Sequence, residues 1–158
     1  HLDAAGNGVE VRTLWGELAA QLGGQAAYDE LMKEADLNGS SPGSTTLAQL
    51  FERAGPTLVL IDELVAYARN LPGGADGGAH GSAHGSAHGA GFGNVLTFVQ
   101  ALTEAAKRSP RTLVVASLPE SSIEFGNEAG RRAAEALEHT FGRMEAIWRP
   151  VTPIEGFE

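Results

Sequence analysis

The sequence predicts an α/β fold in which helices cover both faces of a parallel β-sheet, so that the domain has three layers. Two short runs, Leu58–Ile61 and Thr112–Ala116, carry this prediction because they consist mostly of β-branched and leucine residues, as strands buried on both faces do. A helical pattern separates them, and strand–helix–strand units place their two strands parallel in one sheet. The 158 residues suit one domain with its own core.

The segment before the first strand is expected to be mostly helical. Its elements are, in order, an edge strand or strand end at 9–12, a helix from 14 to about 22, a helical segment over 28–36, a loop at 38–43 and a short helix that ends at 54. Thr13 is the expected N-cap of the first helix, and Gly23-Gly24 its end. Thr46 and Gln49 have the spacing of a capping box that opens the short helix.

Helices are also expected on either side of the second strand. A helix from 63 to about 71, a helix that Asn94 caps, a helix over 128–141 and a last strand at 144–148 complete the pattern. A glycine-rich insertion lies at about 72–93, and the unit Ala-His-Gly recurs in it at four-residue spacing. Small residues cannot offset the entropy of ordering by burial, so the insertion is predicted to be flexible and on the surface.

Composition and charge narrow the classes of function. Twenty acids against eleven bases give a net charge of −9, so general binding to a nucleic-acid backbone is disfavoured, because it requires clustered Lys and Arg. The chain has no cysteine, which excludes a disulfide framework, a thiolate zinc site and a cysteine nucleophile. No apolar run reaches the ~18 residues of a membrane span, and a cytoplasmic location is expected.

Asp62 and Glu63 directly follow the first strand, and ligands bind at the carboxyl ends of the strands in α/β proteins. In P-loop ATPases two acids in this position form the Walker B motif. The first acid holds Mg²⁺ through its water shell, and the second orients the attacking water. The other interpretation is structural, with Asp62 as the N-cap of a helix that begins near Glu63. The matching phosphate loop, G-x-x-x-x-G-K-[ST], is absent from the 158 residues.

Ser117 ends the second strand, so its hydroxyl is predicted to lie beside Asp62 at the same edge of the sheet. Sensor-type ATPases place a polar side chain near the terminal phosphate at this position. The alternative is a serine that only forms the turn before Leu118 and Pro119.

Four arginines are candidates for an arginine finger, which stabilises charge on the transferring phosphoryl group, often from a neighbouring subunit. Arg131 and Arg132 open a helix, and Arg143 and Arg149 flank the expected last strand. Arg143 is preferred because it follows a helix near an expected domain edge. The alternative for each arginine is a solvated side chain without a catalytic role.

His80, His84 and His88 form a regular series in the insertion. Imidazoles at such spacing are able to bind Zn²⁺ or Ni²⁺. A glycine-rich loop does not preorganise them, however, so low-complexity expansion is the favoured account of the repeat, and weak adventitious metal binding is the alternative.

Six segments together carry a resemblance to a known family. They are Thr13–Ala19, Leu60–Arg69, Phe98–Lys107, Val115–Pro119, Thr140–Arg143 and Trp148–Pro150. These segments look like the ATPase core of large bacterial and archaeal AAA-type P-loop ATPases, which are similar to ATPases found beside DNA methyltransferases in phage-defence clusters. Apart from the His/Gly-rich insertion, the resemblance covers almost the whole chain, residues 1–158, as a partial P-loop ATPase core.

The resemblance implies a parent protein of many hundreds of residues, with its phosphate loop upstream of residue 1. It implies that Asp62 holds Mg²⁺ and Glu63 orients water, and less directly that Ser117 acts as a sensor and Arg143 as a finger. The implied partners are ATP with Mg²⁺, the remainder of the parent chain and further copies in a homo-oligomer.

The main departure from the family pattern is the missing phosphate loop. Its glycine-rich backbone and lysine form the principal cradle for the β- and γ-phosphates. The 158 residues alone are therefore expected to bind ATP weakly or not at all and to be inactive as an enzyme. The alternative to a Walker B-containing ATPase part is a non-catalytic ATPase-like scaffold or interaction domain.

Overall fold

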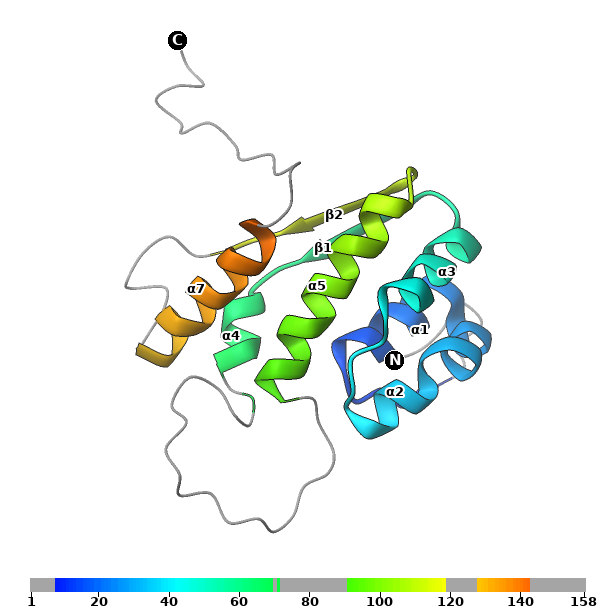
Figure 1. Ribbon diagram of the computed structural model, residues 1–158. Helices are drawn as coiled ribbons and strands as arrows, with labels where there is room; N and C mark the ends of the chain where they lie inside the picture. The colour runs from blue at the N-terminus through cyan, green and yellow to red at the C-terminus, as the bar shows by residue number, and fades with distance from the viewer. Residues whose placement is uncertain (1–7, 70, 72–90, 119–127, 143–158) are drawn as a thin grey trace.

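The computed structural model describes residues 8–69, 71, 91–118 and 128–142 (Figure 1). These residues form a mostly helical α/β domain with a small two-stranded sheet. The elements are, in chain order, α1 (Leu14–Ala27), the π-helix η1 (Tyr28–Met32), α2 (Lys33–Asn38), α3 (Ser44–Ala54), β1 (Thr57–Ile61), α4 (Leu64–Arg69), α5 (Phe92–Arg108), β2 (Thr112–Ala116) and α7 (Glu128–Gly142).

The parallel pairing predicted for the two apolar runs is confirmed. β1 and β2 are parallel, with Thr57 opposite Thr112 and Ile61 opposite Ala116, and α4 and α5 connect them. One more ladder bond extends the pairing, because the Ser117 N–H donates to the Ile61 carbonyl at 3.0 Å. The carboxyl ends of the two strands therefore lie next to each other at one edge of the sheet.

The expectation of helices on both faces of the sheet is wrong for the described residues. Val59 points to the covered face and is 6 % exposed, whereas Leu58 and Leu60 on the same strand are 57 % and 69 % exposed. Leu113 and Val115 of β2 are also exposed, and in Figure 1 the helices lie on one side of the two strands. Leu58, Leu60, Leu113 and Val115 together are called the open face below. Apolar runs identify the strands, but they do not reveal whether one face or both are covered.

The core lies between the helices and the covered face of the sheet. Trp15 of α1 and Phe98 of α5 are almost fully buried, and their ring centroids are 5.4 Å apart. α5 packs against α3 and α7 as well as against β2, so it is the central helix of the covered side. Removing a buried aromatic side chain of this kind costs about 3–5 kcal/mol.

The predicted start of α1 is confirmed, but its predicted end is not. The Thr13 hydroxyl oxygen accepts a hydrogen bond from the Gly16 N–H at 3.1 Å, as an N-cap does. Gly24 adopts a non-helical φ of 63° and ψ of −162°, yet the helix resumes and continues to Ala27. Gly24 therefore kinks the helix instead of ending it.

Two other helices begin earlier than predicted. α3 begins at Ser44 with Gly43 as its N-cap, so the capping box expected at Thr46 is wrong. α5 begins at Phe92, which ends the predicted insertion before residue 93 and places Asn94 inside the first turn. The Asn94 side chain instead donates to the Gly39 carbonyl at 2.8 Å, a contact with a distant loop that local sequence does not reveal.

The remaining predictions have mixed outcomes. Residues 9–12 form no strand, and the helix expected over 63–71 is confined to Leu64–Arg69. The helix predicted over 128–141 is confirmed as α7. The insertion at 72–90 with its three histidines, the strand at 144–148, Arg143 and Arg149 lie outside the described residues. Among the described residues, no helix combines the length and the hydrophobicity needed to cross a bilayer.

Candidate functional site

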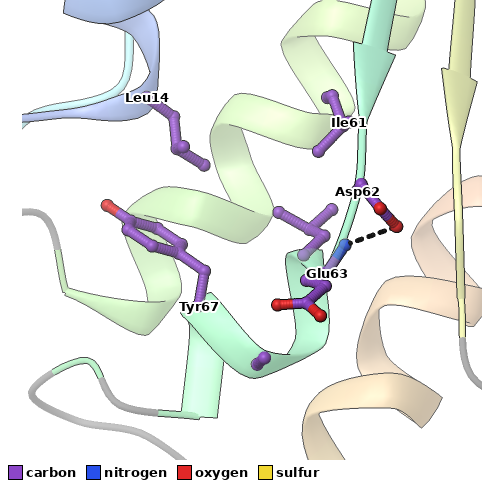
Figure 2. Close-up of a pocket in the computed structure, with 7 residues that line it drawn as sticks. Leu14, Ile61, Asp62, Glu63 and Tyr67 are labelled. Carbon is purple, nitrogen blue, oxygen red and sulfur yellow. Dashed lines mark hydrogen bonds between the residues drawn. The ribbon is translucent and has the colours of Figure 1, made fainter.

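The candidate site lies where β1 and β2 end. Asp62 follows β1, Ser117 follows β2, and the Ser117 hydroxyl donates a short hydrogen bond to Asp62 Oδ1. The Glu63 N–H donates to the same oxygen at 3.0 Å (Figure 2) and lies 3.4 Å from Ser117 Oγ. The predicted proximity of Ser117 to Asp62 is therefore confirmed, while the chemical roles given to both residues stay predictions.

The register of the sheet produces this proximity. Because Ile61 is opposite Ala116, the next residue along each strand is Asp62 in β1 and Ser117 in β2. Main-chain pairing thus brings together two polar side chains that are 55 residues apart in sequence. Within the described part of the chain, Asp62 Oδ2 has no hydrogen-bond partner, so one carboxylate oxygen of Asp62 is free to accept a hydrogen bond from a ligand or a metal-bound water.

Glu63 has an unusual backbone conformation. Its φ is 54°, and it is the one non-glycine residue with a positive φ among the described residues. This region costs an L-residue free energy, and such strain is found preferentially at functional sites. The Glu63 carboxylate is exposed and makes no hydrogen bond or ion pair with the described residues, so the side chain does not compensate for the strain through a contact of its own.

The geometry argues against the interpretation of Asp62 as a helix cap. α4 begins at Leu64, and Asp62 accepts from the N–H of Glu63, which precedes the helix. A capping side chain accepts instead from the second or third N–H of the helix. The hydrogen bond of Asp62 therefore shapes the turn between β1 and α4.

A shallow pocket adjoins the two acids on the helical side. Its lining residues are Leu14, Ile61, Asp62, Glu63, Leu64, Ala66 and Tyr67. In Figure 2 the Glu63 carboxylate lies on the pocket side with Tyr67, whereas Asp62 points toward β2. Burial, followed by the charge of Asp36, raises the pKa of Tyr67, so its hydroxyl stays protonated at neutral pH. The pocket combines apolar walls with a carboxylate at its rim.

The carboxylates of the site would hold a divalent cation only together with further ligands, such as waters and substrate phosphates. The described residues contain no group of three or more His, Asp or Glu side chains arranged to hold a metal ion. Mg²⁺ usually keeps several waters and is held by one or two carboxylates together with substrate phosphates. Asp62 with its free Oδ2 fits that pattern, but it does not make a metal site that is complete within the chain.

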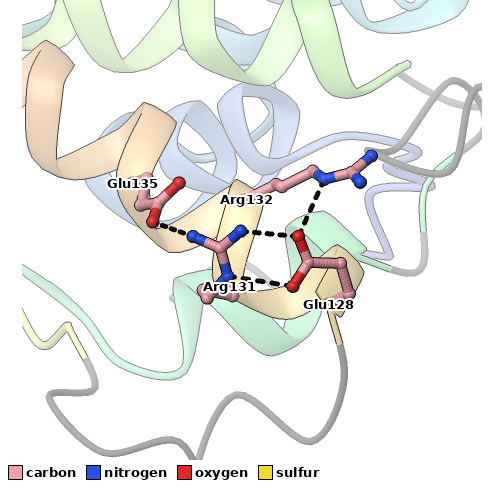
Figure 3. A network of polar contacts seen from close by, with 4 residues as sticks. All are labelled: Glu128, Arg131, Arg132 and Glu135. Atoms are coloured by element: carbon pink, nitrogen blue, oxygen red, sulfur yellow. Dashed lines mark hydrogen bonds and ion pairs between the residues drawn. The ribbon is translucent and has the colours of Figure 1, made fainter.

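The arginines at the start of α7 are engaged within their own helix (Figure 3). Arg131 makes two hydrogen bonds to the Glu128 carboxylate, at 2.9 Å and 2.5 Å, and a further short one to Glu135. Arg132 also donates to Glu128, at 3.2 Å. The two guanidinium groups, that of Arg131 above all, lower the pKa of Glu128 to about 2. Arg131 is thus committed to a local network, and the preferred finger, Arg143, lies outside the described residues.

A buried carboxylate next to the pocket was not predicted from the sequence. Asp36 is 1 % exposed and accepts hydrogen bonds from the Arg12 N–H at 3.1 Å, the Thr13 N–H at 2.9 Å, the Thr13 hydroxyl at 2.5 Å and the Tyr28 hydroxyl at 2.8 Å. These bonds fix the chain just before Leu14, which lines the pocket. In the sequence Asp36 resembles any acid of a surface helix, so no local signal distinguishes it.

A family model described as the DUF499 N-terminal domain matches residues 3–158. No curated protein and no solved structure matches the chain.

Proposed function

We propose that this chain, which belongs to the family of DUF499 N-terminal domains, carries the Walker B half of an AAA-type ATPase site. The supporting observation is the cluster of Asp62, Glu63 and Ser117 at the carboxyl ends of two neighbouring parallel strands. Ligands of α/β proteins bind at this edge. A carboxylate with a free oxygen, a strained and exposed second acid and an adjacent hydroxyl fit the needs of phosphoryl transfer.

Each residue has a distinct proposed role. Asp62 holds the turn through Oδ1 and would accept hydrogen bonds from the water shell of Mg²⁺ through Oδ2. Mg²⁺, when bound, would neutralise charge on the β- and γ-phosphates of ATP. Glu63 projects an unpaired carboxylate beside the pocket and orients the attacking water. Ser117 keeps Asp62 in place in the present structure through its hydroxyl donor, and in its proposed sensor role this single donor turns from Asp62 to the terminal phosphate. Arg143 is proposed as the finger that acts on a neighbouring copy in a homo-oligomer.

The phosphate-binding half is proposed to come from the remainder of a longer parent chain. The 158 residues lack the G-x-x-x-x-G-K-[ST] loop, whose backbone N–H groups and lysine supply most of the phosphate contacts. The chain alone is therefore proposed to bind ATP weakly or not at all and to be inactive.

Substitution of Glu63 in the full-length parent tests the ATPase. Glu63→Gln is expected to reduce ATP hydrolysis by roughly 100-fold or more, in the range of general-base contributions, and to leave ATP binding unchanged. Glu52→Gln is the matched control, because Glu52 is an exposed glutamate of α3 away from the site. Hydrolysis by Glu63→Gln at the rate of the control would show that Glu63 does not orient the water.

The open face favours a second candidate, a non-catalytic ATPase-like scaffold or interaction domain. Exposed apolar surface of this kind marks interaction sites in many proteins, and it requires no nucleotide chemistry. A scaffold predicts that the full-length parent lacks a phosphate loop and does not bind ATP. Equilibrium binding of a fluorescent ATP analogue to the parent separates the two candidates directly.

A further inference from the structure

Four of the five large apolar side chains that are exposed among the described residues belong to the open face. Leu58, Leu60, Leu113 and Val115 are 57 %, 69 %, 60 % and 46 % exposed. The register places Leu58 beside Leu113 and Leu60 beside Val115, so the four side chains form one continuous aliphatic patch. Neither strand contains a charged residue, although charges or prolines usually protect the edge strands of a sheet from pairing with another chain.

The two faces of the sheet differ in their surroundings, and the covered face is the less aliphatic of the two, because Thr57 and Thr112 lie on it. On the covered face, Val59 is 6 % exposed, and on that side α5 packs against β2. Parallel sheets occur almost only where helices cover both faces. The open face is thus built like a surface that a second layer of helices covers.

We propose that the open face is the docking surface for an amphipathic α-helix of the same polypeptide, contributed from outside these 158 residues. The apolar stripe of that helix packs across the four side chains, about 10 Å above the sheet. The inference shares with the proposed function the requirement for a longer polypeptide, but it does not depend on ATP hydrolysis.

The size and charge of the surface favour a tethered helix over a second copy of the chain. A standard interface between separate proteins uses roughly 20–30 residues on each side, whereas the open face supplies four. Each copy also carries a net charge of −9, so two copies repel each other. A helix within the same polypeptide avoids most of the translational and rotational entropy cost of association, and a small aliphatic surface is then sufficient.

Because the 158 residues contain no cysteine, a single introduced thiol reports on the covering of the open face. Leu60→Cys and, as a second variant, Val115→Cys place thiols on this face. Leu37→Cys is the matched control, since Leu37 is an exposed leucine of α2, 41 % exposed. Each variant is labelled with a maleimide in the 158-residue chain and in the full-length parent, and labelling at the introduced position is followed by peptide mass spectrometry.

In the 158-residue chain, Leu60→Cys and Val115→Cys are expected to react as fast as Leu37→Cys. In the parent, both open-face thiols should react roughly tenfold or more slowly, because a covered side chain reacts only when the covering segment opens, while Leu37→Cys stays unchanged. Equal labelling in chain and parent overturns the proposal. If the slower labelling in the parent disappears on dilution, a second copy covers the open face. To locate the covering segment, the introduced thiol is also labelled with a benzophenone maleimide and cross-linked by light. A cross-link that maps within residues 1–158 means that this chain itself covers the face. Both results also overturn the proposal. ATP hydrolysis by the parent, measured separately, tests the proposed function independently.

Discussion

Replacement of Glu63 by glycine is expected to stabilise the chain while it removes the carboxylate proposed to orient water. Glu63 has a φ of 54°, which glycine adopts without steric cost. The glutamate side chain is exposed and makes no hydrogen bond or ion pair with the described residues. Removal of this side chain should therefore lower the free energy of unfolding only slightly.

The size of the gain follows from two opposing contributions. A left-handed conformation costs an L-residue roughly 1–2 kcal/mol. Glycine makes the unfolded chain more flexible, which offsets about 0.4–1 kcal/mol of that gain. The free energy of unfolding should therefore rise by about 0.5–1 kcal/mol. For a domain of this size, that corresponds to an increase in Tm of about 1–4 °C.

Urea and thermal unfolding of three variants measure the effect. Glu63→Ala is the matched control, because it removes the carboxylate but keeps the cost of the positive φ. We expect Glu63→Gly to be more stable than Glu63→Ala, and Glu63→Ala and Glu63→Gln to unfold close to the unsubstituted chain. If Glu63→Gly is the least stable variant, the strain argument is wrong and the glutamate side chain supports the fold.

Three further predictions concern the buried Asp36 and its partners. Asp36→Ala should lower the free energy of unfolding by about 3 kcal/mol or more, because it leaves buried donors of Thr13 and Tyr28 without an acceptor. Urea denaturation measures the loss, and Asp29→Ala, at an exposed position of η1, is the control. Gly16→Ala should also destabilise, since a Cβ there would lie 2.1 Å from Asp36 Oδ1, and an unchanged urea midpoint would contradict the packing described. Burial and the hydrogen bond to Asp36 raise the pKa of Tyr28 to about 12, above the ~10 of an unfolded tyrosine. The contribution of Tyr28 to the free energy of unfolding should therefore be complete below pH ~10 and fall as the pH rises toward about 12. Tyr28→Phe should weaken this fall in unfolding experiments.

The parts of the structure that the sequence predicted are those that depend on short-range pattern and on one general rule of topology. The two apolar runs identify β1 and β2, and parallel strands place their carboxyl ends together, so the proximity of Asp62 and Ser117 could be predicted from these residues alone. The N-cap at Thr13 is equally local, because a side chain three residues from its partner determines it.

The parts that were missed depend on contacts across the chain. Asp36 accepts hydrogen bonds from residues up to 24 positions away, and Asn94 from α5 donates to Gly39. Partners that lie 24 or 55 positions apart fall outside the windows of about 11–18 residues in which sequence periodicity is assessed. The exposure of the open face was missed for a different reason. Leucines in an apolar strand, such as Leu58 and Leu60, are expected to be buried, and only the three-dimensional surroundings show that they are exposed.

The open face and the candidate site are connected through β1. Leu60 and Asp62 are two residues apart, and the turn that holds Asp62 begins where the pairing of β1 with β2 ends. A two-stranded sheet is marginal unless other elements pack on it, and among the described residues helices pack on one face only. A helix that covers Leu60 and Val115 would add packing to both strands at once and would stabilise the register that brings Ser117 to Asp62. We therefore expect Leu60→Lys in the proposed full-length parent, which places a charge under the proposed helix, to weaken the proposed ATP hydrolysis as well as stability. Leu37→Lys on α2 should affect neither, and full hydrolysis by a folded Leu60→Lys parent would separate the open face from the site.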